Sequence, residues 1–119
     1  MIERIYADYA WEQTAALLAI DSPSGYTQNA AKWVENAFSS LGFDSAITVK
    51  GGVLVDLGGE DVNDALLLEA HADTLGAMVA EVKGNGRLRL TALGGMNPNN
   101  AEAENVRVYT RGGTVIEGT

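Results

Sequence analysis

The sequence predicts an α/β fold in which two helices pack on the start of a mixed sheet and an incomplete antiparallel β domain follows. Three observations lead to this prediction. Apolar residues recur at helical spacing in two stretches before residue 42, and a nearly continuous apolar run occupies residues 65–71. Short β-rich segments separated by glycine turns then follow from residue 77. We expect residues 1–73 and 74–119 to form two separate parts.

Both predicted helices lie before Gly42. Residues 2–20 carry an imperfect apolar stripe, and turn-forming residues at 21–25 end it. Residues 30–41 hold the clearest helical pattern, because apolar side chains recur there every three or four positions. Gly42 stands where a residue of left-handed conformation commonly follows a helix. The candidate N-caps of the second helix are Ser24 and Thr27.

The rest of the chain is predicted to be β-structure. Residues 46–49 and 53–57 flank a Lys-Gly-Gly turn and are typical of a hairpin. The run at 65–71 lacks the alternation of a half-exposed strand, so we expect a central strand that is covered on both faces. Residues 97–104 are predicted to be a polar loop. The remaining predicted strands, joined mainly by glycine-containing turns, are 77–82, 87–91, 106–110 and 114–117.

The composition restricts the possible functions. The 119 residues suffice for one ordinary domain, and 8 basic against 16 acidic residues leave a formal charge of −8. No basic block is present to neutralise a row of phosphates, so nucleic acid is not an expected partner. The absence of cysteine means that any metal must be held by His, Asp or Glu. Because we find neither a signal peptide nor a membrane span, we expect a cytoplasmic protein without a membrane partner.

His71 is the strongest candidate for chemistry. It is the sole histidine of the sequence and lies at the C-terminal end of the predicted buried strand, at the kind of sheet edge where binding crevices form. If the strand continues, Glu69, His71 and Asp73 share one face, so a carboxylate can lie beside the imidazole. Taken alone, a His-x-Asp triplet is more often a hydrogen-bonded histidine at a strand end with a turn-forming aspartate. Ser22 and Ser24 do not indicate a serine hydrolase, because no nucleophile-elbow pattern surrounds them.

The sequence around His71 resembles the signature of one peptidase family. The segment Leu66-Leu67-Leu68-Glu69-Ala70-His71-Ala72-Asp73-Thr74-Leu75-Gly76-Ala77-Met78-Val79 is similar to that of the tetrahedral, glutamyl and deblocking aminopeptidases, some of which are labelled endoglucanases. Pro23-Ser24-Gly25 resembles the loop before that family's second helix. The segments 86–95, 105–108 and 112–116 resemble its following strands, in the same order. The resemblance therefore extends over nearly the whole chain.

The resemblance implies a metal-dependent aminopeptidase that hydrolyses N-terminal amino acids from peptides. It implies that His71 binds one of two divalent ions, either zinc, cobalt or manganese, and that Asp73 acts in the catalytic site by orienting the imidazole. Residues 1–73 would be the N-terminal part of a zinc-peptidase-like catalytic domain. Residues 74–119 would begin an inserted β domain that supports homo-oligomerisation. Thr74 departs from the pattern, since the family usually has an acidic residue there.

The other ligands of the family pattern lie C-terminal to the His-x-Asp motif. They include a bridging aspartate, a pair of glutamates containing the general base, a further acidic ligand and a second histidine. We therefore expect an N-terminal segment that is inactive by itself, because such hydrolysis needs two metals and a carboxylate base. One alternative is a non-catalytic assembly or binding module derived from this fold. Another is a stand-alone single-metal protein in which His71 and Asp73, with or without Glu69, bind an ion at a subunit contact.

Overall fold

The computed structural model describes residues 2–61 and 63–119. The chain divides into two compact units, Met1–Thr74 and Leu75–Thr119. The first unit contains two helices and one β-hairpin, and the second contains two further hairpins. The protein is therefore of mixed α/β composition, as the sequence predicts. In the part of the chain that the structure describes, no helix combines the length and apolar character needed to cross a membrane.

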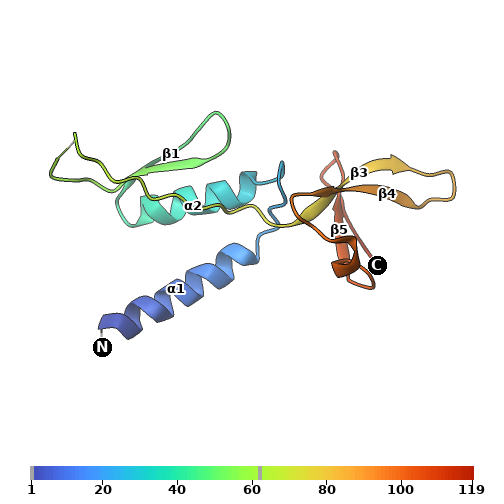
Figure 1. Ribbon diagram of the computed structural model, residues 1–119, viewed down its shortest axis with the longest axis horizontal. Helices are drawn as coiled ribbons and strands as arrows, with labels where there is room; N and C mark the ends of the chain where they lie inside the picture. Colours follow the sequence, from blue (N-terminus) through green and yellow to red (C-terminus); the bar gives the residue numbers. More distant parts are fainter. Residues whose placement is uncertain (1, 62) are drawn as a thin grey trace. The chain divides into compact units, whose positions relative to one another are not determined.

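The helices of the first unit are α1, Ile2–Leu18, and α2, Gln28–Ser40 (Figure 1). Helix α1 ends two residues before the predicted Ile20. Thr27 occupies the N-cap position of α2, but its side chain makes no capping hydrogen bond, so the predicted side-chain cap is wrong. The Ser24 hydroxyl does not cap the helix either, because it donates to Asp73.

Helix α2 ends in a Schellman motif, which confirms the role predicted for Gly42. The Gly42 N–H donates to the Ser39 carbonyl at 3.0 Å, and the Phe43 N–H donates to the Phe38 carbonyl at 3.2 Å. Gly42 has φ +88°, a conformation that a side chain would strain. The rings of Phe38 and Phe43 meet edge to face, with centroids 6.3 Å apart. Local sequence thus determines where the helix stops.

A β-hairpin packs against α2. Its strands are β1, Asp44–Ile47, and β2, Val53–Asp56, which pair antiparallel (Figure 1). Both strands contact α2, and a hydrogen bond of 2.8 Å between the hydroxyls of Ser39 and Ser45 joins the helix to β1. The predicted hairpin is therefore confirmed, with strand ends that differ from the prediction by at most two residues.

The expected central strand at residues 65–71 is wrong, and so is the expected mixed sheet. Within the described residues, the strands form three separate two-stranded antiparallel sheets. Residues 65–71 belong to no strand, and Leu66, Leu67 and Leu68 are 84%, 73% and 75% exposed. A strand needs a hydrogen-bonding neighbour, and no described strand pairs with this run. The residues classed as buried among those described are Ser22, Ala30 and Ala31.

The second unit consists of two hairpins, as the sequence predicts. Its first hairpin pairs β3, Gly76–Val82, with β4, Leu88–Leu93, and its register shifts between Val79 and Glu81. Its second hairpin pairs β5, Val106–Tyr109, with β6, Val115–Gly118. The intervening polar segment contains a short 3-10 helix, η1, Pro98–Asn100.

Candidate functional site

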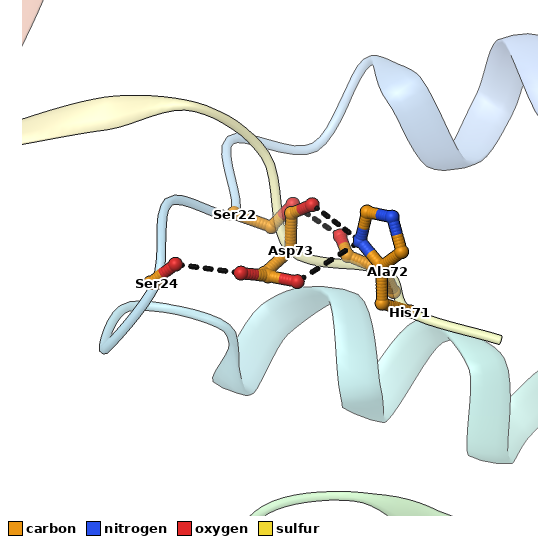
Figure 2. A network of polar contacts seen from close by, with 5 residues as sticks. All are labelled: Ser22, Ser24, His71, Ala72 and Asp73. Carbon is orange, nitrogen blue, oxygen red and sulfur yellow. Dashed lines mark hydrogen bonds and ion pairs between the residues drawn. The ribbon is translucent and has the colours of Figure 1, made fainter. Parts of the chain in front are cut away.

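His71 and Asp73 form a hydrogen-bonded pair at the C-terminal end of the apolar run (Figure 2). The His71 Nδ1 atom lies 3.0 Å from Asp73 Oδ1 and 3.1 Å from the Asp73 backbone carbonyl oxygen. A carbonyl oxygen and a carboxylate can only accept, so Nδ1 must carry a proton in these contacts. In the neutral imidazole this leaves Nε2 with the unshared electron pair, which is the form that binds a metal.

The imidazole is accessible. The His71 side chain is 85% exposed, and the Asp73 side chain is 42% exposed. Two shallow hollows of the first unit, of about 370 and 420 Å³, are lined by α1 and α2 residues and by the β1–β2 hairpin. Neither hollow is lined by His71 or Asp73. The pair therefore presents the imidazole on an open surface of the unit.

The loop between α1 and α2 holds the segment that carries this pair. The Ser22 hydroxyl donates to the Ala72 carbonyl at 2.8 Å, and the Thr74 N–H donates to the Ser22 carbonyl at 2.9 Å. A parallel bridge pairs Pro23 with Thr74. The Ser24 hydroxyl donates to Asp73 Oδ2 at 2.6 Å (Figure 2). Ser22 is 1% exposed, so its hydroxyl makes its contact with Ala72 from a buried residue.

These contacts favour the charged form of Asp73. The hydrogen bond from the Ser24 hydroxyl is the largest influence and lowers the pKa of the Asp73 carboxyl below its ordinary value, and the hydrogen bond from His71 lowers it further. Limited desolvation acts in the opposite direction but does not reverse the shift. Asp73 is therefore an ionised acceptor for the imidazole N–H at neutral pH.

The structure does not bring Glu69 to the pair. Glu69 is exposed, and no hydrogen bond joins it to His71 or Asp73. The described residues contain no group of three or more His, Cys, Asp or Glu side chains arranged to hold a metal ion. The loss of the expected strand explains the position of Glu69, because the shared face depended on regular β geometry at residues 69–73.

Ser22 and Ser24 are the site residues whose role the sequence reasoning missed. The sequence suggests Ser24 as a helix cap and indicates neither serine as a nucleophile. The structure instead shows that the hydroxyls of Ser22 and Ser24 donate to Ala72 and Asp73. The partners lie 50 and 49 residues away along the chain, so no local pattern could reveal them. The available signal was the resemblance of Pro23-Ser24-Gly25 to a loop of the same peptidase family.

Comparison with known proteins identifies the family. Residues 51–119 match the M42 glutamyl aminopeptidase family, and this match includes His71, Asp73 and the whole second unit. The chain is a member of that family, which confirms the resemblance seen in the sequence.

Two curated relatives match most of the chain. "Putative aminopeptidase YhfE" of Bacillus subtilis (strain 168) is 36% identical over 103 residues, which are 87% of this chain and 30% of the relative. "Glutamyl aminopeptidase" of Lactococcus lactis subsp. cremoris (strain MG1363) is 27% identical over 107 residues, which are 89% of this chain and 30% of the relative. The chain thus spans about 30% of the length of these relatives.

Proposed function

We propose that this chain is an N-terminal segment of a two-metal aminopeptidase that removes N-terminal amino acids from peptides. In this proposal His71 binds one divalent ion through Nε2, and Asp73 orients the imidazole from the opposite side. The observation that carries the proposal is the 3.0 Å contact between His71 Nδ1 and Asp73 Oδ1. It supports a ligand role because it leaves Nε2 unprotonated on an exposed side chain.

The donor set fits part of a metal site. An imidazole nitrogen backed by a carboxylate suits zinc, cobalt or manganese, but one ligand does not complete a coordination shell. In the whole enzyme, a pair of bound ions would supply an activated water and polarise the scissile carbonyl. This chain's own groups have two roles in the proposal. Asp73 keeps the proton on Nδ1 of the imidazole, and His71 presents Nε2 to the ion.

The two units receive different roles in this proposal. Residues 1–73 would belong to a zinc-peptidase-like catalytic domain, and residues 74–119 would begin an inserted β domain that supports homo-oligomerisation. The exposed leucines at positions 66–68 support the view that further protein covers this run. In such a setting the run could pair as the central strand that its apolar character predicts.

Hydrolysis of amino-acid anilides tests the proposal directly. The purified 119-residue chain and the same chain extended C-terminally to the length of its relatives are assayed with zinc, cobalt or manganese. We expect turnover by the extended chain and none by the 119-residue chain. His71→Ala should reduce turnover to background, and Asp73→Asn should reduce it by about 10-fold to 100-fold. Glu69→Gln is the matched control, because this nearby carboxylate makes no contact with the pair.

The alternatives give different results in the same assay. Turnover by the 119-residue chain that is lost in His71→Ala would contradict the proposal that the site needs more of the protein. No metal-dependent turnover by either form would instead favour a non-catalytic assembly or binding module. Stoichiometric metal bound by the 119-residue chain without turnover, and lost in His71→Ala, would favour a single-metal protein.

A further inference from the structure

The hydroxyl of Ser24 donates to the Asp73 carboxylate, which in turn contacts the His71 imidazole (Figure 2). We propose that Ser24 is a positioning residue: it holds the Asp73 carboxylate in the orientation that keeps His71 in its Nδ1–H tautomer. The importance of this tautomer for metal binding rests on the function proposed above. The positioning itself depends only on groups that the structure describes.

The two oxygens of the Asp73 carboxylate have separate partners. Oδ2 accepts from the Ser24 hydroxyl at 2.6 Å, and Oδ1 lies 3.0 Å from His71 Nδ1. A half-exposed carboxylate can rotate about its last side-chain bond unless one oxygen is held. The donor on Oδ2 restricts this rotation, so Oδ1 stays directed at the imidazole. Ser24 therefore acts on His71 through Asp73.

Ser24 can serve as a fixed donor because it lies in a tight turn. The Tyr26 N–H donates to the Pro23 carbonyl at 2.8 Å and closes the turn. Gly25 has φ +86°, as the third residue of a type II turn requires. The Ser24 side chain thus projects from a backbone corner that has little freedom to move.

The loop is also fastened directly to the segment that bears Asp73. The hydroxyl and the carbonyl of Ser22 bind Ala72 and Thr74, the neighbours of Asp73 on either side. Pro23 forms a parallel bridge with Thr74. These contacts fix the register between the loop and the segment. They therefore keep Ser24 opposite Asp73. Ser22 holds the backbone, and Ser24 holds the side chain.

Nitrogen NMR of the histidine ring tests the proposal on the 119-residue chain. The sequence contains one histidine, so its ring signals need no assignment among several. Spectra are recorded with a chelator at about pH 8.5, so that the neutral ring is observed. We expect the wild type to be mainly protonated on Nδ1. Ser24→Ala should lower the ratio of the Nδ1–H to the Nε2–H tautomer by about threefold to tenfold, the range expected for one net hydrogen bond.

Two further variants separate positioning from a general effect on the fold. Ser24→Thr keeps a hydroxyl and should restore most of the wild-type tautomer ratio. Ser40→Ala is the matched control, because it removes an exposed serine hydroxyl that donates to the Asn36 carbonyl within α2, and it should leave the ratio unchanged. A role of Ser24 that was only structural would not bias the ring toward one nitrogen.

The proposal can be overturned even if Ser24→Ala fails to fold. A wild-type histidine that is mainly protonated on Nε2 overturns the proposal without any variant. An unchanged ratio in a folded Ser24→Ala also overturns it. The measurement uses neither metal nor substrate, so it is independent of the peptidase assay. If Ser24→Ala loses the tautomer bias, the positioning role is supported. If the extended chain also shows no turnover, the proposed function is rejected while the positioning role stands.

Discussion

The two parts of the segment 65–74 differ in what holds them in place. Residues 72–74 are tied to the loop at 22–24 by three hydrogen bonds that involve Ser22 and Ser24. Residues 65–71 have no strand partner, and their leucines are exposed. Polar contacts within the first unit thus suffice to assemble the His71–Asp73 pair. An apolar strand requires neighbours on both sides, and no described strand pairs with this run.

The largest expected effect is a loss of stability that distinguishes an exposed run at residues 65–71 from one that further protein covers. Leu67→Asp should change the free energy of unfolding of the 119-residue chain by less than about 0.5 kcal/mol, because the side chain is 73% exposed. In the C-terminally extended chain the same change should cost about 3 kcal/mol or more, since it would bury an unpaired charge. Urea denaturation of both forms measures the difference. Equal small losses in both would show that the run stays uncovered.

A smaller effect is expected where the loop holds the segment. Ser22→Ala removes the donor to the Ala72 carbonyl from a residue that is 1% exposed. The free energy that holds the segment in place should fall by about 1–2 kcal/mol, because the part-buried Ala72 carbonyl is left without its donor. Amide hydrogen exchange at Thr74, whose N–H donates to Ser22, should therefore accelerate by about tenfold.

The matched control for this experiment is Ser40→Ala, which removes an exposed serine hydroxyl from α2. It should leave Thr74 exchange unchanged. Equal exchange in Ser22→Ala and wild type would show that the Ser22 hydroxyl does not hold the segment.

The smallest expected effect is the response of the site to acid. The pKa of the Asp73 carboxyl is lowered in the folded chain from an ordinary value of 3.8, mainly by the Ser24 hydroxyl. A lowered pKa means that the carboxylate contributes stability above pH 3.8, and that this contribution is lost as the pH falls through the folded-state pKa. Carboxyl carbon NMR should give a midpoint below 3.8 for the wild type and a higher midpoint for Ser24→Ala. Identical midpoints would contradict the assignment of Ser24 as the main cause.

The predictions from sequence succeeded where short-range chemistry decides the structure. Helix α2 ends just before Gly42, because a left-handed residue there satisfies the last carbonyls. The described hairpins follow from β-rich runs on either side of glycine-containing turns. His71 and Asp73 are two residues apart, so a contact between them could be anticipated from spacing alone. The resemblance to the aminopeptidase family was readable from the same segment and is confirmed over residues 51–119.

The sequence by itself therefore determined the two helices, the hairpins, the family and the contact between His71 and Asp73. Only the tertiary structure decided that residues 65–71 have no strand partner. It also decided that Ser22 and Ser24 hold residues 72–74. The physical reason is the same in both cases. Strand pairing and the contacts of Ser24 depend on partners distant in the chain, and spacing along the sequence carries no information about which distant groups meet.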